Sequence, residues 1–335
     1  MPVGPGERRR LLAAGEHVRS RAGRRDIAQF AARYGIFVVF VLLVGVLVIA
    51  SPTFRQPGNL WNILQQNSII GIVSCGMLLM MIAGGFDLSV GSIGSATTVV
   101  AALFFVQGAI PLGLVAALGV GLTVGLLNGL LITKVRINPF VATLGMSVLV
   151  QGVVFVGTNA APIYNVPQDF TVVGLGRIGP VPIAAIIYAA VAVSTWAVLR
   201  FSRLGYYIYA VGGNKEASRL AGIPVDRVLI GAFMLGGLCA SIAGLILLGQ
   251  TGIGTPAGAA TWPLSAIAAC VVGGTSLSGG VGTVLGAVVG TLLLGVVANA
   301  LNLFGVSPYW QPAVTGVVIL AAVGIDSLQR ARSGS

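Results

Sequence analysis

The chain has 335 residues, of which 56% are hydrophobic and only 8% are charged. Soluble domains carry about 25% charged residues, because their surface must be solvated. At roughly 20 residues for each crossing of the hydrocarbon core, a chain of this composition has room for about ten spans. The composition excludes an ordinary soluble enzyme and predicts an all-α, polytopic membrane protein.

Ten apolar runs, bounded by proline, glycine, asparagine or charge, predict the spans. They cover residues 35–51, 63–83, 88–106, 110–132, 139–157, 181–199, 228–249, 263–274, 281–304 and 309–325. The run at 263–274 is short for a crossing, so a broken or re-entrant element is the alternative there. The first run is interpreted as a retained span rather than a cleaved signal.

Basic residues set the orientation of these spans. The chain carries 19 lysines and arginines, and eight arginines precede residue 34. With that tail in the cytoplasm, ten crossings leave only Arg55 and Arg177 outside, as the positive-inside rule requires. We therefore expect both termini to be cytoplasmic. The predicted parts are a basic tail (1–33), a transmembrane domain (34–326) with an inner loop at 200–227, and a C-terminal tail (327–335).

The cysteines, the single histidine and the basic tail offer little chemistry. The three cysteines lie inside apolar runs, form no C-x-x-C pair and are expected to be small buried apolar residues: Cys75, Cys239 and Cys270. His17 lies in the tail, so no histidine-based metal site is expected within the membrane. A basic tail beside a span is a topology signal or a contact with anionic lipid, and we expect no nucleic-acid binding.

Tryptophans are expected at the outer membrane edge (Trp61, Trp262, Trp310) and the inner edge (Trp196).

The inner loop contains the most informative polar segment. Asn214 is suited to cap a helix start, Glu216 suits the positive end of the dipole, and Gly222 with Pro224 is a stop signal. The spacing predicts a helix of about two turns. Its apolar residues at i, i+3 and i+4, namely Ala217, Leu220 and Ala221, form one small face. That face is suited to a groove on another protein or to the lipid surface.

A glycine-rich segment, Gly84 to Ser92, separates the second and third runs and contains Asp87. A carboxylate in the bilayer centre costs about 2.5 to 3.5 kcal/mol on insertion scales. We therefore expect Asp87 to have a structural or functional role. One interpretation, the favoured one, makes Asp87 a cap of the third span at a membrane-edge turn. The other places it in a broken helix that lines a polar pathway.

A related segment occurs later in the chain, where Gly273 to Gly280 repeats the pattern G-G-x-x-L-S-x-G. In the predicted topology both copies face the cytoplasm. We expect equivalent hinges or gates there, built from the residues that the two copies contribute: Gly85, Asp87, Ser89, Gly91, Gly273, Gly274, Ser276 and Gly280.

Several uncharged amides stand among the apolar residues: Gln65, Gln66, Asn67, Asn128, Gln151 and Asn299. Amides donate and accept hydrogen bonds at a lower desolvation cost than charges, which suits contact with a neutral hydroxylated solute. Hydrogen bonding between helices is the alternative for each of them.

Two absences limit the function. Neither lysine completes the G-x-x-x-x-G-K-[ST] phosphate cradle, so ATP hydrolysis by this chain is not expected. Proton-coupled carriers place several ionisable groups in their spans, whereas Asp87 is nearly alone here. Coupling to an ion gradient is therefore disfavoured.

Four segments make the chain resemble the sugar-type permease subunits of bacterial ATP-binding-cassette importers, the group that includes the ribose permease. They are Gly85 to Gly91, Tyr209 to Asn214 continuing to Ile223, Ala266 to Ala269 running into Gly273 to Leu277, and Gly279 to Thr283. Their order and spacing fit from Ile36 to Asp326.

This resemblance implies a multi-pass protein of the bacterial cytoplasmic membrane. It also implies a transport subunit that is not itself an enzyme. It implies a second permease subunit, identical or paralogous, an extracytoplasmic sugar-binding protein, and cytoplasmic subunits that bind ATP and Mg²⁺. No cofactor would be bound by this chain. It makes one inner-loop segment the coupling helix for the ATPase: Asn214, Lys215, Glu216, Ala217, Leu220, Ala221 and Gly222.

The expected function is import of a ribose- or xylose-type monosaccharide by alternating access. Related permeases carry a nucleoside, a branched-chain amino acid or a furanosyl signal molecule, so the same machine with another cargo is the first alternative. A stand-alone gradient-driven carrier is the second.

Overall fold

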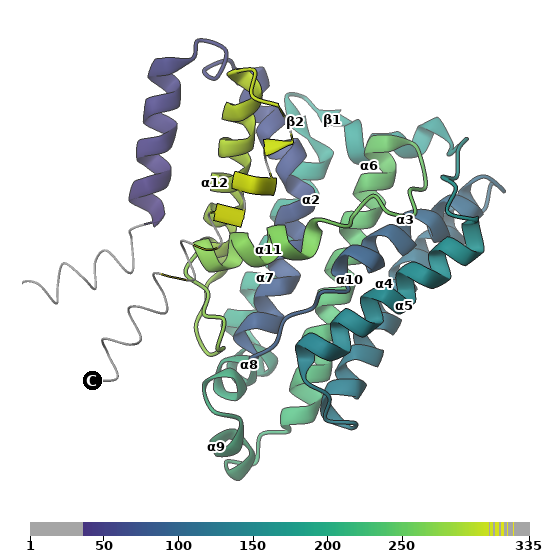
Figure 1. Cartoon of the computed structure of the whole chain (residues 1–335), viewed down its shortest axis with the longest axis vertical. Coiled ribbons are helices and arrows are strands. Elements are labelled where there is room, and N and C mark those ends of the chain that lie inside the picture. Colours follow the sequence, from purple (N-terminus) through teal and green to yellow (C-terminus); the bar gives the residue numbers. More distant parts are fainter. Residues whose placement is uncertain are drawn as a thin grey trace, which may run out of the picture.

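The computed structural model describes residues 36–307, together with 309–310, 312–314, 316–317, 320 and 324. These residues are mostly helical (Figure 1). The first helix covers Ile36–Ala50. It is followed by α2 (Pro57–Ile82), α3 (Val90–Phe105), α4 (Ile110–Thr133), α5 (Pro139–Thr158), η1 (Gln168–Phe170), α6 (Thr171–Leu175), β1 (Arg177–Ile178), β2 (Val181–Pro182), α7 (Ile183–Phe201), α8 (Arg203–Gly213), α9 (Lys215–Leu220), α10 (Val225–Thr251), α11 (Trp262–Val272) and α12 (Val284–Leu303). β1 and β2 pair antiparallel.

Six of the described helices are long and apolar enough to cross a membrane: α2, α4, α5, α7, α10 and α12. The helix Ile36–Ala50, α3 and α11 are apolar but shorter. α11 has 11 residues and is therefore about 16 Å long, roughly half the hydrocarbon thickness. Figure 1 shows it running across the long helices, as the broken or re-entrant alternative requires. In the tenth predicted span, 309–325, residues 311, 315, 318–319, 321–323 and 325 lie outside the described residues.

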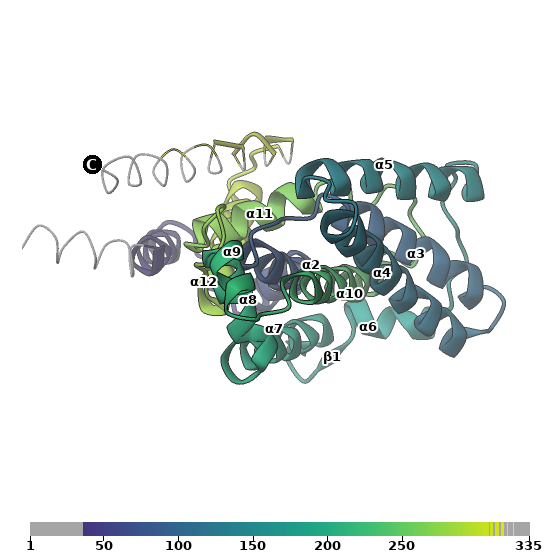
Figure 2. The same ribbon diagram turned by 90° about the horizontal axis from the view of Figure 1, so that it is seen from below.

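The centre of the molecule is formed by α2 and α10. Both helices are mostly buried, and α10 packs against α2, α3 and α4. Seen from below, they lie between α7 on one side and α4 on the other (Figure 2). Most residues of the outer helices α4, α5 and α7 are not fully buried, so the outer faces of these apolar helices suit contact with lipid rather than with water.

The packing of α4 on α10 depends on small residues at every fourth position. Gly113, Ala117, Gly121, Gly125 and Gly129 form this column along α4. A Cβ at Gly121 would overlap the carbonyl of Gly237, and one at Gly125 would overlap that of Phe233. Membrane helices lack a hydrophobic force to join them and gain contact by close backbone approach. The column therefore positions the segment between α2 and α3, which lies beside α4.

Several predictions about individual residues have a clear outcome. The three cysteines are free and buried, as expected. α2 begins at Pro57, six residues before the predicted start. The residues Gln56 to Asn59 are typical of a loop, but proline is also favoured in the first turn of a helix. The Trp262 indole is buried against Gly94 of α3, so it is not exposed as an anchor at the membrane edge.

Candidate functional site

The helix predicted in the inner loop is present as α9. The Asn214 side chain accepts a hydrogen bond from the backbone N–H of Ala217 at 2.9 Å, which caps the helix. Glu216 and Arg219 form an ion pair of 2.8 Å along its surface. Gly222 adopts a φ of +79° and ends the helix. The capped helix, its acidic first turn and its glycine stop are thus confirmed.

One side of α9 is free of contacts. Ala217, Leu220 and Ala221 are exposed, and the Leu220 side chain is 90% exposed. Ser218 is buried on the side that faces the protein. A six-residue helix is marginal by itself, so the caps and the buried side hold the apolar face in place. That face has no partner in the described part of the chain.

Directly before α9, three chain segments meet at a junction formed by Ile82, Gly84, Gly212, Gly279 and Gly280, here called the glycine junction. The carbonyl of Ile82, at the end of α2, accepts a hydrogen bond from Gly280 N at 2.9 Å. A Cβ at Gly212 would overlap that carbonyl, and one at Gly279 would come within 2.9 Å of Gly84 Cα. The two copies of G-G-x-x-L-S-x-G therefore contact each other and the end of α8.

Further contacts hold the other residues of the two copies. Gly85 lies beside the Phe233 ring, Gly91 against the carbonyl of Ala259, and Gly273 against that of Gly286. Gly274 has a φ of +85°. The N–H of Ser276 donates to the carbonyl of Val281 at 2.9 Å. These contacts fix the shape of both turns.

Asp87 is fully buried in the segment between α2 and α3. Its Oδ1 accepts hydrogen bonds from the backbone N–H and the hydroxyl of Ser89, both at 2.6 Å, and its Oδ2 accepts from Asn128 Nδ2 of α4 at 3.1 Å. Thr143 of α5 accepts from the N–H of Leu88 at 3.1 Å. Asp87 thus joins the turn to α4.

The interpretation of Asp87 as the cap of the third span is wrong, and its place in a polar pathway stays a prediction. The N-cap of α3 is Ser89, and Asp87 closes an Asx-type turn one residue before the helix. The carboxylate does not line either cavity described below. Asp87 is not the N-cap because α3 begins at Val90. The hydrogen bond from the Ser89 N–H to Asp87 therefore lies before the first turn of the helix.

A cavity of about 280 Å³ lies between α2, α11 and α12. Its polar lining consists of two amides from α2 and three hydroxyls: Gln66, Asn67, Thr261, Ser265 and Thr291. Trp262 and aliphatic side chains complete it, and none of its described lining residues is charged. The hydroxyls and Trp262 were not predicted, because isolated threonines and serines in apolar runs give no sequence signal.

The six predicted amides fall into two groups. Gln66 and Asn67 line the cavity. The other four bond to neighbouring elements: Gln65 to the carbonyl of Gly174, Asn128 to Asp87, Gln151 to the carbonyl of Pro256, and Asn299 reciprocally to Asn59. The interhelical alternative describes Gln65 and Asn299, whereas Asn128 and Gln151 bond to segments between helices.

The sequence comparisons agree with this architecture. Residues 59–323 match the family model described as branched-chain amino acid transport system / permease component. The match covers most of the chain, which therefore belongs to this family of membrane permease components of transport systems.

Curated relatives are similar along nearly the whole chain. The ribose import permease protein RbsC of Escherichia coli (strain K12) is 41% identical over 295 residues, covering 87% of this chain and 92% of the relative. RbsC of Bacillus subtilis (strain 168) is 37% identical, with 88% and 92% covered. The galactose/methyl galactoside import permease protein MglC of E. coli (strain K12) is 35% identical, with 93% and 99% covered. No solved structure matches the chain.

Proposed function

We propose that the chain is the permease subunit of an ATP-driven importer that moves a monosaccharide across the bacterial cytoplasmic membrane by alternating access. Its curated relatives are named as import permeases for ribose and for galactose and methyl galactoside. The family description names branched-chain amino acids instead. The cavity favours the sugar, because amide and hydroxyl groups without charge suit a neutral solute better than a zwitterion.

The observation that carries the proposal is the exposed apolar face of α9. The coupling helix is formed by Asn214 to Gly222, with Leu220 inserted into a groove of a cytoplasmic ATPase. ATP binding by the partner moves α9, and the glycine junction passes that movement to α2 and to the loop after α11. Nucleotide and sugar affinities are then coupled in both directions.

The remaining parts of the machine follow from this assignment. ATP and Mg²⁺ bind to the partner and no cofactor binds to this chain. A second permease subunit completes the membrane core, and an extracytoplasmic binding protein delivers the sugar. The spans run from 34 to 326, the inner loop at 200–227 and the tails at 1–33 and 327–335 face the cytoplasm, and the turns at 84–89 and 273–280 act as inner hinges.

Copurification from the native membrane in mild detergent, followed by mass spectrometry, tests the assignment. We expect an ATPase subunit in equal ratio with the permease. Leu220→Asp is expected to abolish that association without unfolding the permease. The matched control is Val135→Asp, because Val135 is also exposed (62%) and follows α4 at the end where Lys134 reaches Asp226 beside α9. Unchanged association of the Leu220 variant rejects the coupling helix. Uptake by the chain alone, driven by an ion gradient, rejects the importer.

Orientation is tested with a single introduced thiol. The native cysteines are buried, so Ser278→Cys in the second repeat is expected to react with a membrane-impermeant reagent only from the cytoplasmic side. Reaction from outside overturns the proposed topology.

The cargo is tested by uptake of labelled ribose and of labelled leucine, measured in native cells and in a strain that lacks the chain. Loss of leucine uptake alone assigns the amino acid instead.

A further inference from the structure

A second cavity, of about 470 Å³, lies at the end of the molecule that carries α9. It is formed where α7 ends, α8 passes and α12 begins, and it is lined by Trp196, Leu199, Arg200, Ser202, Tyr206, Tyr209, Thr283, Val284 and Leu285. α7 has 19 residues and a length of about 28 Å, close to the hydrocarbon thickness. Its last turn therefore lies at the level of the lipid headgroups.

The free polar groups of this lining are hydrogen-bond donors. Within the described residues, the Arg200 guanidinium forms no ion pair, and the Tyr206 hydroxyl and the Trp196 indole N–H form no hydrogen bond. The Thr283 hydroxyl accepts from Gly286 N at 3.0 Å and keeps its proton for a further acceptor. None of the described residues that line the cavity is acidic. Together these groups favour an anion.

Two other polar groups are already in use and shape the wall. Tyr209 donates to the carbonyl of Gly282 at 2.8 Å, and burial raises the pKa of its phenol, which stays neutral. Ser202 donates to the carbonyl of Val198 and accepts from Gly205 N. These bonds join α8 to its neighbours and to the segment before α12, so the fold holds this part of the wall in place.

The apolar part of the lining is exposed. Leu285 and Trp196 are exposed, and the Trp196 ring contacts the exposed Phe201 edge to face, with ring centres 5.2 Å apart. Exposed aromatic rings at the end of a spanning helix are typical of the membrane interface. A ligand with an anionic head and an apolar tail would contact both parts of the lining.

We propose that this cavity binds the headgroup phosphate of an anionic phospholipid. Arg200 and Tyr206 contact the phosphate, and the acyl chains lie along Trp196 and Leu285. A basic cavity between helices at the membrane edge is the setting in which anionic lipid headgroups bind. The site adjoins α8 and the start of α12, whose neighbouring segments form the glycine junction, so a bound lipid would hold the two helices together.

Lipid binding to the full chain tests the proposal. The purified chain is exchanged into nanodiscs that contain phosphatidylglycerol, phosphatidylcholine or their mixture, and retained lipid is counted by native mass spectrometry after release. We expect retention of phosphatidylglycerol and a loss of about tenfold in its affinity in Arg200→Gln. Arg203→Gln is the matched control, because Arg203 is also exposed on the same end but does not line the cavity. Tyr206→Phe, which removes only an exposed hydroxyl, is expected to weaken binding about threefold.

Four results overturn the proposal. Equal retention by the Arg200 and Arg203 variants removes the site. Equal retention of phosphatidylcholine removes its preference for an anion. Displacement of the lipid by millimolar inorganic phosphate identifies a site for the free ion instead. Loss of ATPase association in Arg200→Gln with normal lipid retention would assign this surface to the protein partner.

Discussion

Gly212 lies directly against the carbonyl of Ile82, so that a single added methyl group would overlap that oxygen. The same oxygen accepts a hydrogen bond from Gly280. The end of α8, the end of α2 and the loop after α11 are therefore in backbone contact, without side chains between them. A backbone contact transmits displacement without the rotamer changes that side chains allow, which suits a segment joined to α9.

This contact predicts a sharp difference between two neighbouring glycines. Gly212→Ala is expected to lower the free energy of unfolding by about 1 to 3 kcal/mol, because the added methyl meets backbone that cannot rotate away. Gly213→Ala is the matched control, since nothing lies within 4 Å of a Cβ there; its effect is expected to be within about 0.5 kcal/mol. Equilibrium unfolding in mixed micelles measures both, and equal effects contradict the close approach.

Substitution of the buried Asp87 is expected to lower the stability of the protein strongly. Asp87→Ala leaves the N–H of Ser89 and the amide of Asn128 without their buried acceptor, and we expect a loss of about 3 kcal/mol or more. Asp87→Asn keeps one acceptor for Ser89 and is expected to lose less. Asp169→Ala, which removes an exposed carboxylate, serves as the control. If the two alanine variants unfold at the same temperature, Asp87 has no structural role.

Gln65 and Gln66 are neighbours on α2 with different predicted roles. Gln66 lines the first cavity and makes no hydrogen bond within the described residues, whereas Gln65 bonds to Gly174 and Arg177. Gln66→Leu is expected to raise the KM for sugar uptake roughly fivefold with little change in stability. Gln65→Leu is expected to lower stability by about 1 kcal/mol and leave KM unchanged. An unchanged KM in the Gln66 variant would remove this cavity from the transport pathway.

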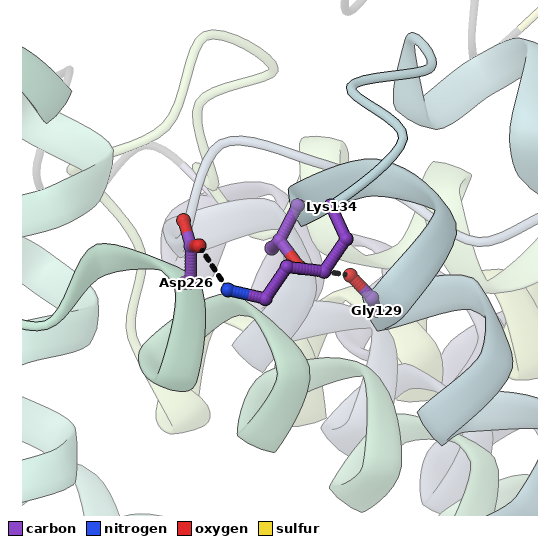
Figure 3. A network of polar contacts seen from close by, with 4 residues as sticks. Gly129, Lys134 and Asp226 are labelled. Atoms are coloured by element: carbon purple, nitrogen blue, oxygen red, sulfur yellow. Dashed lines mark hydrogen bonds and ion pairs between the residues drawn. The ribbon is translucent and has the colours of Figure 1, made fainter.

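The ion pair between Lys134 and Asp226 predicts a small effect. Their side chains are 2.7 Å apart and 61% and 38% exposed, and Figure 3 shows Lys134 reaching from the end of α4, beside Gly129, to Asp226 at the start of α10. Exposed pairs contribute about 0 to 1 kcal/mol and are screened by salt. Asp226→Asn is therefore expected to cost less than about 1 kcal/mol, and the cost should decrease at high salt. A larger, salt-independent loss would indicate a role in assembly.

Local signals in the sequence predicted local structure well. The apolar runs correspond to helices from Ile36 to Leu303, and the Asn214 cap and the Gly222 stop are where the residue types indicated. These features depend on a few adjacent residues, whose preferences are strong. The orientation of the spans depends on the bilayer, and it stays a prediction.

Contacts between distant segments were less predictable. The G-G-x-x-L-S-x-G repeat was visible, but its two copies are 189 residues apart and nothing in one sequence indicates that Gly84 and Gly279 touch. The roles of the amides could not be predicted for the same reason. Gln151 and Gln66 occur in similar apolar stretches of sequence and differ only in the residues that surround them in the fold. The column of small residues along α4 was not predicted, because glycine occurs throughout this chain and nothing in one helix indicates α10 as its partner.

The column along α4 also determines which inherited changes the protein tolerates. Every missense change in a glycine codon adds a side chain, and at Gly121 or Gly125 that side chain meets backbone of α10. Exchanges among aliphatic residues on the exposed faces of α5 and α7 add nothing that lipid cannot accommodate. In a random mutagenesis screen, loss-of-function alleles should therefore concentrate at these small buried residues, while the exposed aliphatic positions accept exchange.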